Sequence, residues 1–328
     1  MEKTKRKKGL IILSVTIILL IFLAGAMIFY YFGKKYDFYN YSKAEIEIPG
    51  LKDGFVPQGL CTLQTENGYL ISGYMKDTSK PSRIYYVNEQ GSSKYVLLDT
   101  LQTNLDNGHF CGIAARNGLV WLATDGYVFT VDLQSIVNAT QGDVLTTIDI
   151  FEAGIKTDFC YADDNMLYVG EFYRPGKYEV DETHYVKVSD SETNHGIALC
   201  YNIDVTKQYG LKTTEPVKAI SVPDQAQGFC ITESGKMVVS TSYSLPDSKI
   251  LIYDNPTLEE NKINVNGNDL DLYVLSSNNL NKTIIAPCMS EGIDYKNGRV
   301  HILFESACAK YKYFTRVREK HVQSIEIN

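Results

Sequence analysis

Polar and ionisable residues recur at matching places along the chain, just before or within short apolar runs such as GLCTL, FCYA and GIDY. If the runs are repeated strands around an axis, side chains at one place in successive repeats face a common channel. Carboxylate and amide oxygens are hard donors that suit Ca²⁺ better than zinc. Asp158 and Glu291 are therefore predicted as metal ligands. The predicted ligand-facing set is Gln58, His109 with Cys111, Asp158, Gln227 and Glu291.

A second set follows the next apolar run of each repeat, at Asp125, Glu171, Ser242 and Glu305. A charge inside a strand such as VGEFY or LFESA is costly unless it is partnered. Glu171 and Glu305 are therefore catalytic candidates together with His109 and Glu291. A carboxylate near a histidine orients a general base or activates a metal-bound water. The alternative to a catalytic role is a structural one, in which Glu171 forms an ion pair with Arg174, and Glu305 with Lys310, at the surface.

The alternative for the first set is structural: a central channel of this kind is filled with water, so its polar side chains are simply hydrated. His195 is predicted to be a loop residue, although it could reach the channel. His184, His301 and His321 have no ionisable residues grouped around them in the sequence. No HExxH, GxSxG, Walker A or GxGxxG pattern occurs, so zincin, serine-hydrolase, P-loop and dinucleotide-binding classes lack support.

The elements that must position these residues follow a repeat, for which residues 227–254 are the template. Short runs rich in Val, Ile, Tyr and Phe alternate with turns of Gly, Pro, Asp and Ser, as in antiparallel hairpins. Four-strand units recur every 47 to 69 residues or so, the range of propeller blades with insertions. The second unit is expected to end with a strand at 144–151, and the fourth with a strand at 272–276. The longest insertion is 173–196, in the third unit.

The fifth unit lacks a fourth strand, and residues 44–48 form a strand without a unit. Pairing the two predicts an all-β, five-bladed β-propeller in which the N-terminal strand completes the C-terminal blade. Such closure also removes exposed sheet edges. A β-sandwich is the alternative, but it leaves the repeat unexplained.

The N-terminus is distinct from the repeats. Residues 1–8 form a basic tail with five Lys or Arg, and residues 9–32 are apolar and uncharged. Their length predicts an uncleaved, single-pass signal anchor in the cell membrane. A cleaved signal peptide is the alternative, because Ala24-Gly25-Ala26 resembles a cleavage site. The positive-inside rule places the tail in the cytoplasm, with a linker at 33–43 and an extracellular propeller at 44–328.

The net charge bears on the partners of the domain, and the positions of the cysteines bear on its disulfides. Without the first eight residues, 27 basic and 38 acidic residues remain, a net charge of −11. This balance argues against nucleic acid and against a second contact with anionic lipid. Cys61, Cys160 and Cys230 recur at one place in apolar strands and are predicted to be small core residues. Cys288 and Cys308 flank a hairpin, and a disulfide between them is one prediction, a pair of free thiols the other.

Four motifs, PQGL, GFCITESGKMVVSTSYS, SEGIDY and LFESACAKYKY, resemble a family of exported bacterial propeller proteins without assigned function. The resemblance runs from about residue 56 to 313 and implies a propeller in an extracellular setting. DNMLYVGEFYRPGKYEV, residues 164–180, is similar in one blade to the five-bladed calcium-activated nucleotidases. This second resemblance implies a Ca²⁺ ion on the propeller axis, but no catalytic residues transfer from it.

These features favour a membrane-anchored extracellular binding module that recognises a small molecule, glycan or protein at the axial mouth. The first alternative is a metal-dependent hydrolase, of Ca²⁺ type, acting on phosphoester, nucleotide or lactone substrates. The second is a structural scaffold of the cell envelope. A fold of this kind hosts many functions and does not choose among them.

Overall fold

The structure is a computed structural model that describes residues 2–32, 34–65, 67–100, 104–259 and 262–327. The chain divides into two compact units, Met1–Asp37 and Phe38–Asn328. The second unit therefore begins within the expected linker of residues 33–43.

The first unit is dominated by helix α1 (Glu2–Phe32). Its stretch Lys7–Tyr30 has 24 residues and a mean hydropathy of 2.9, and it is not buried against protein. Length and composition suffice to cross a membrane, although a signal sequence has the same properties.

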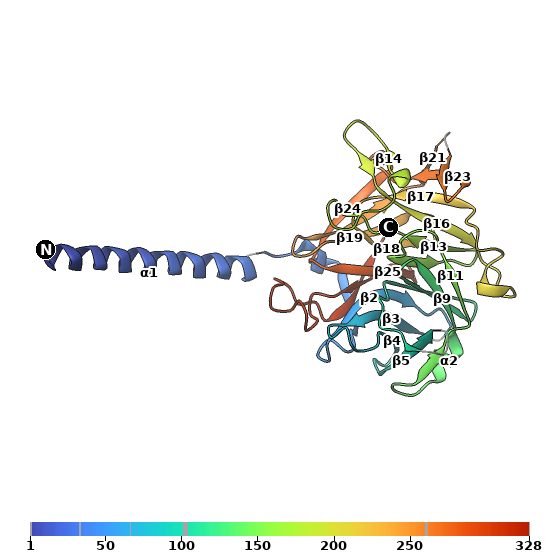
Figure 1. Cartoon of the computed structure of the whole chain (residues 1–328), viewed down its shortest axis with the longest axis horizontal. Helices are drawn as coiled ribbons and strands as arrows, with labels where there is room; N and C mark the ends of the chain where they lie inside the picture. The colour runs from blue at the N-terminus through green and yellow to red at the C-terminus, as the bar shows by residue number, and fades with distance from the viewer. Residues whose placement is uncertain (1, 33, 66, 101–103, 260–261, 328) are drawn as a thin grey trace. The chain divides into compact units, whose positions relative to one another are not determined.

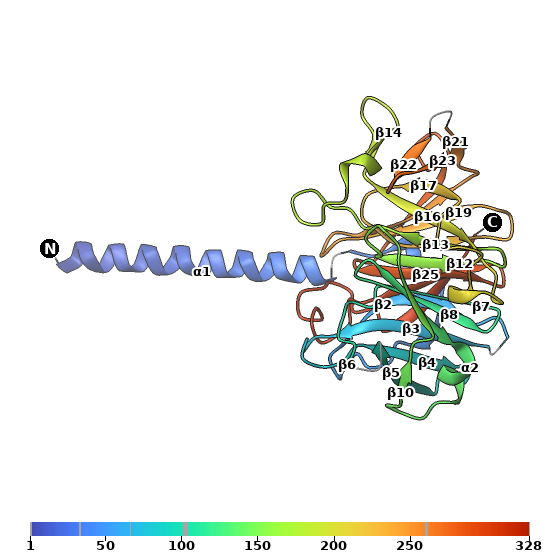
Figure 2. The same ribbon diagram turned by 45° about the vertical axis from the view of Figure 1, so that its right-hand side comes forward.

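The second unit is an all-β, propeller-like domain (Figures 1 and 2). The described residues form five sheets of four or more strands and a two-stranded ribbon. The first sheet contains β2 (Phe55–Thr62), β3 (Gly68–Met75), β4 (Arg83–Asn88), β5 (Ser93–Thr100), β6 (Asn104–Leu105) and β10 (Val144–Thr146). The second contains β7 (Gly112–Arg116), β8 (Leu119–Thr124), β9 (Tyr127–Asp132) and β11 (Asp149–Glu152).

The third sheet contains β12 (Phe159–Ala162), β13 (Met166–Gly170), β16 (Gly196–Asn202), β17 (Lys218–Val222), β21 (Thr257–Leu258), β22 (Ile263–Val265) and β23 (Asn268–Val274). The fourth contains β18 (Ala226–Ile231), β19 (Met237–Thr241), β20 (Ser248–Tyr253) and β24 (Leu280–Ala286). The last contains β25 (Ser290–Lys296), β26 (Arg299–Phe304), β27 (His321–Glu326) and β1 (Ser42–Glu47). The ribbon is β14 (Val186–Lys187) with β15 (Thr193–Asn194). The short helices are α2 (Leu133–Asn138) and three 3₁₀ turns, Asp37–Asn40, Glu182–His184 and Gln208–Gly210.

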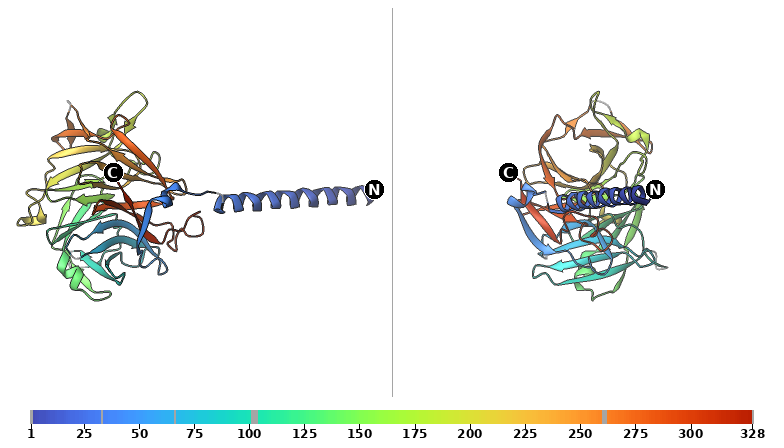
Figure 3. Two further views of the ribbon diagram at one scale, coloured as in Figure 1. Left: turned by 180° about the vertical axis from the view of Figure 1, so that it is seen from behind. Right: turned by 90° about the vertical axis from the view of Figure 1, so that its left-hand side faces the viewer.

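The first strand of each sheet lies beside the first strand of the next. β2 neighbours β7, β7 neighbours β12, β12 neighbours β18, β18 neighbours β25, and β25 neighbours β2. The succession of sheets can be followed by colour around the domain in Figure 3, where the blue first strand lies alongside the red last one. β1 pairs antiparallel with β27, in a register that joins Ser42 to Ile325 and Glu47 to His321. The expected pairing of the N-terminal strand with the last unit is thus formed.

Glycines make the close approach of these first strands possible. A Cβ added at Gly59 would lie 2.8 Å from the backbone nitrogen of Ile113, and one at Gly228 would lie 2.7 Å from that of Ile293. At Gly292 the corresponding distance, to the nitrogen of Leu60, is 2.6 Å. Each of these glycines directly follows a polar residue of the predicted channel set. The glycines that let the first strands approach one another therefore also fix the polar residues that precede them near the starts of these strands.

Two expected strands are assigned differently. The run 144–151 splits into β10, which runs parallel to β5 in the first sheet, and β11, which closes the second sheet on β9. The run at 272 belongs to β23, which runs parallel to β17 in the third sheet, and the fourth sheet is closed by β24. Both errors arise because apolar alternation identifies a strand but not its partner. β23 buries Leu270, Leu272 and Val274 in the core of the neighbouring sheet.

All seven cysteines are buried and free. Cys61, Cys160 and Cys230 are core residues, as predicted. The disulfide prediction for Cys288 and Cys308 is wrong for this structure. Beyond Phe304 the chain leaves the hairpin and folds into turns, in which the Cys308 nitrogen donates to the Glu305 carbonyl, so the hairpin register does not extend to the cysteines.

Candidate ligand-binding site

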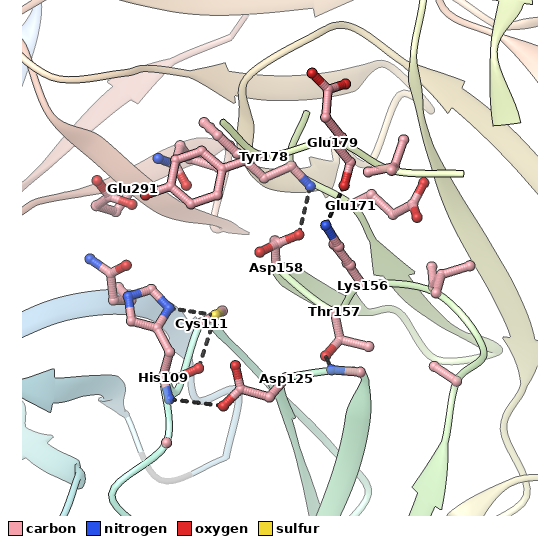
Figure 4. Close-up of a pocket in the computed structure, with 18 of the residues that line it drawn as sticks. His109, Cys111, Asp125, Lys156, Thr157, Asp158, Glu171, Tyr178, Glu179 and Glu291 are labelled. Carbon is pink, nitrogen blue, oxygen red and sulfur yellow. Dashed lines mark hydrogen bonds between the residues drawn. The ribbon is translucent and has the colours of Figure 1, made fainter. Parts of the chain in front are cut away.

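The cavity ends of the first strands open into one cavity of about 1700 Å³. Figure 4 shows His109, Asp158 and Glu291 facing this space from different strands and loops. Nine residues of the two predicted sets line it: Gln58, His109, Cys111, Asp125, Asp158, Glu171, Gln227, Glu291 and Glu305. Ser242 is not among the lining residues. Its hydroxyl accepts hydrogen bonds from Ser248 Oγ and from the Met289 nitrogen, which holds the turn before Glu291.

Glu291 and Glu305 form a buried carboxyl pair. They come from β25 and from the turn after β26, and they are 3% and 9% exposed. Burial, followed by the neighbouring carboxylate, raises the pKa of Glu291 well above its ordinary value. Burial raises the pKa of Glu305 to about 7. Gln58 Nε2 donates to Glu305 Oε2 at 3.1 Å. The pair thus retains a proton near neutral pH and can both donate and accept hydrogen bonds.

Lys310 lies beside this pair but does not form the surface ion pair with Glu305 that the sequence allowed. Its ammonium group donates to the Tyr74 hydroxyl at 2.6 Å and lies 5.0 Å from the centre of the Tyr311 ring. It still lowers the pKa of Glu305 electrostatically, opposing part of the effect of burial. Burial raises the pKa of both tyrosines, so they remain phenols at neutral pH.

His109 and Cys111 form a dyad at the second sheet. The ring nitrogen Nδ1 lies 2.8 Å from Cys111 Sγ, and the backbone nitrogen of His109 donates to Asp125 Oδ2 at 3.3 Å. The imidazole also packs on Tyr74, with ring centres 4.4 Å apart. Enclosure by the cavity walls lowers the pKa of His109, and burial followed by the charge of Asp158 raises that of Cys111. The dyad is therefore a neutral imidazole and a thiol at neutral pH.

Asp158 is the third acidic group of the cavity. Its Oδ2 accepts a hydrogen bond of 2.8 Å from the Phe172 nitrogen. Burial nonetheless raises the pKa of Asp158 to about 7, and the like charge of Glu171 nearby adds to this effect. Asp158 is thus partly protonated at neutral pH.

Glu171 is buried, with 2% of its surface exposed. Its carboxylate lies 3.0 Å from His184 Nδ1 and accepts a hydrogen bond from the Ile197 nitrogen. The alternative of a surface pair with Arg174 is wrong, because Arg174 lies over the Tyr243 ring at 4.0 Å. The prediction that His184 lacks ionisable neighbours is also wrong. The 173–196 insertion folds back and brings His184 to the cavity wall, a long-range contact without local sequence signal.

The remaining histidines lie outside the cavity lining. His195 stacks on Tyr173, with ring centres 4.2 Å apart, and its Nδ1 lies 2.9 Å from Asp224. His301 Nδ1 lies 3.2 Å from the Tyr69 hydroxyl. His321 Nδ1 lies 3.6 Å from Glu319. Asp224, the partner of His195, was not visible in the sequence, whereas Glu319 stands only two residues before His321.

Aromatic side chains form one side of the cavity rim. Phe172, Tyr178 and Tyr243 pack together, with ring centres 5.5 to 6.3 Å apart. Lys177 Nζ donates to the Tyr243 hydroxyl at 3.1 Å. The cation–π positions on these rings are thus taken by the protein itself, and the exposed ring surface is left for apolar or sugar-like faces.

The two predicted metal ligands, Asp158 and Glu291, have protein partners in this structure. Among the described residues, no group of three or more His, Cys, Asp and Glu side chains is arranged to hold a metal ion. Glu291 pairs with Glu305, and Asp158 is held by a backbone nitrogen, so the two predicted ligands serve other partners.

No protein-family model and no curated protein matches the chain. The solved structures it resembles include glutaminyl cyclase of Myxococcus xanthus, with 10% identity, a TM-score of 0.43 and coverage of 88% of this chain and 95% of that one. They include the PQQ-bound aldose sugar dehydrogenase of Streptomyces coelicolor, with 16% identity, a TM-score of 0.45 and coverage of 80% and 78%. The nidogen/laminin complex gives 7% identity, a TM-score of 0.40 and coverage of 76% and 73%. These similarities assign no activity, and the resemblance to one exported bacterial family gains no support from them.

Proposed function

We propose that the domain is a binding module that takes a small, hydroxyl-rich ligand such as a glycan into its central cavity. The observation that carries the proposal is the convergence of Gln58, Gln227, Glu291 and Glu305 on one open cavity. Amides and carboxyl groups that retain a proton donate and accept hydrogen bonds, as hydroxyl groups require. At the rim, Tyr178 and Tyr243, which pack on the buried ring of Phe172, offer ring surface on which a sugar can pack.

We propose further that the five large sheets are the blades of a ring closed by β1 and β27. The cycle of neighbouring first strands supports this arrangement. Helix α1 would anchor the protein in a membrane, with the basic tail in the cytoplasm and the domain outside, following the positive-inside rule. In that setting the cavity would sample molecules of the cell envelope.

The binding proposal is tested by the melting temperature of the purified protein against a panel of mono- and oligosaccharides, amino sugars and nucleotides. A ligand at 100 times its Kd stabilises the native state by about 2.7 kcal/mol. We expect the shift to be lost in Gln58→Leu and Gln227→Leu. It should persist in Glu233→Gln, because Glu233 lies in the turn at the opposite end of β18. A shift that survives unchanged in both leucine variants would refute binding in this cavity.

Hydrolysis is the second candidate, favoured by the buried pair of carboxyl groups that Glu291 and Glu305 bring to the cavity. Two neighbouring carboxyl groups with pKa values pushed apart can act as general acid and general base. Phosphoester, nucleotide and lactone substrates in the same panel would show turnover sensitive to Glu305→Gln in this case. In this alternative the carboxyl pair would supply the general acid and the general base.

A further inference from the structure

One loop of the acidic domain is strongly basic. Residues 309–320, AKYKYFTRVREK, contain five Lys or Arg and one Glu, whereas the chain beyond residue 8 has a net charge of −11. We call this segment the basic loop. It joins β26 to β27 and forms the red-brown excursion seen in Figures 1 and 3. Arg316 forms an ion pair with Asp247 at 3.5 Å, and Lys310 lines the cavity and donates to Tyr74. Lys312, Arg318 and Lys320 therefore carry the local positive charge that the net charge of the domain hides.

Two large aromatic side chains project from the basic loop. Tyr313 and Phe314 are 68% and 63% exposed. Lys312 lies over the Tyr313 ring, 5.1 Å from its centre. Exposed aromatic rings among basic residues are the composition that binds the interface of anionic membranes.

The loop is held in shape by its own contacts. The Phe314 nitrogen donates to the Tyr311 carbonyl at 2.8 Å, and Thr315 Oγ1 donates to the Ser306 carbonyl at 2.9 Å. Arg318 Nε donates to the Lys312 carbonyl at 2.6 Å. Little ordering entropy is lost when a loop fixed in this way meets a surface.

The chain enters the second unit next to the basic loop. Phe38 packs on Phe304, with ring centres 6.1 Å apart, and the Tyr39 hydroxyl donates to Glu319 Oε2 at 2.9 Å. Tyr39 and Tyr41 are themselves 40% and 44% exposed. Helix α1 ends at Phe32, and the six Cα–Cα steps from Phe32 to Phe38 can span at most about 22 Å. If α1 lies in a membrane, the point of entry stays within that reach of it.

We propose that the basic loop docks on a lipid surface carrying anionic headgroups, with Tyr313 and Phe314 at the interface. The inference rests on the proposed membrane anchor, and it adds an orientation of the domain relative to the lipid surface. Lys310, Tyr311 and Phe314 also line the cavity, so its mouth opens toward the lipid. The ligand would then be a glycan or headgroup carried by the membrane rather than one free in solution.

The test uses the full chain in nanodiscs that contain brominated lipids, which quench tryptophan at the interface. Trp121, the single tryptophan of the chain, is fully buried, and Phe314→Trp adds a reporter to the loop. Val205→Trp is the matched control. Val205 follows β16, which starts at the cavity wall beside Glu171 and runs away from it, so the control lies at the far end of a sheet.

We expect quenching of the Phe314→Trp reporter at least twofold above that of the control in discs rich in phosphatidylglycerol. Lys312→Gln with Arg318→Gln should reduce it, as should discs of phosphatidylcholine alone. Quenching equal to the Val205→Trp control would overturn the docking proposal, and equal quenching in both lipids would overturn its anionic character. A chain that does not enter the discs would overturn the anchor as well. None of these outcomes alters the melting-temperature test of the cavity, so the two proposals fail separately.

Discussion

Replacing Gly292 with alanine is expected to destabilise the domain by about 3 kcal/mol or more, at the upper end of the cost of overpacking a core. The added Cβ would lie 2.6 Å from the backbone nitrogen of Leu60 and 2.9 Å from the carbonyl oxygen of Gln58. Backbone atoms of a neighbouring strand cannot move aside as a flexible side chain can, so the inner strands must separate. Urea unfolding followed by circular dichroism measures the loss.

Gly91→Ala is the control for this substitution. Gly91 has a φ of +79° in a turn, and nothing lies within 4 Å of the added Cβ. The variant bears only the cost of a left-handed conformation, about 1–2 kcal/mol. Equal losses in the two variants would mean that close approach of the first strands does not organise the domain.

The stability of the domain is expected to fall as the pH rises from about 4 to about 7. Asp158 and Glu305 have a pKa of about 7 in the folded state, because burial disfavours their charged forms. In the unfolded chain they titrate near about 4. The folded state therefore binds more protons within this window, so the free energy of unfolding decreases with pH, and the contribution of these two groups levels off above about 7.

Asp158→Asn and Glu305→Gln should each flatten this decline, by up to a few kcal/mol between the two ends of the window. His109 and His301 act in the opposite direction, because burial lowers the pKa of both. The comparison of variants with wild type isolates the carboxyl contribution. Chemical denaturation at pH 4.5, 5.5, 6.5 and 7.5 provides the measurement, with Glu233→Gln as a surface control that keeps the wild-type slope. An unchanged slope in both cavity variants would show that these carboxyl groups are ionised in the folded protein.

Periodicity predicted much of the fold. The alternating apolar runs identified most strands, and the lone strand near residue 44 together with the incomplete last unit identified the β1–β27 pairing. The partners of β10, β23 and β24 could not be predicted, because the alternation of β23 would bury its apolar face equally well in either neighbouring sheet. Sheet membership depends on long-range packing that single-strand patterns do not encode.

The cavity was predicted in outline and not in its pairings. Matching positions in the repeat placed Gln58, Gln227 and Glu291 correctly in one cavity. The partner of Glu171 was missed because His184 reaches it from an insertion without regular structure. The basic loop was missed because net charge averages over the domain. A window of twelve residues would have found it, since five of its residues are Lys or Arg.

The central claim is that the cavity is open to small molecules and holds the ligand, and Cys111 reports on it most directly. It is the only cysteine among the described residues that line the cavity, and the other six lie elsewhere in the interior. The measurement is the rate of iodoacetamide modification of the folded protein at pH 8.5, read by peptide mass spectrometry, with and without a stabilising compound from the panel. Because burial raises the pKa of Cys111, its reaction is slow, and we predict that the compound slows it at least fivefold further while leaving the rates of Cys288 and Cys308 unchanged. A compound that raises the melting temperature but leaves the rate of Cys111 modification unchanged would contradict the claim.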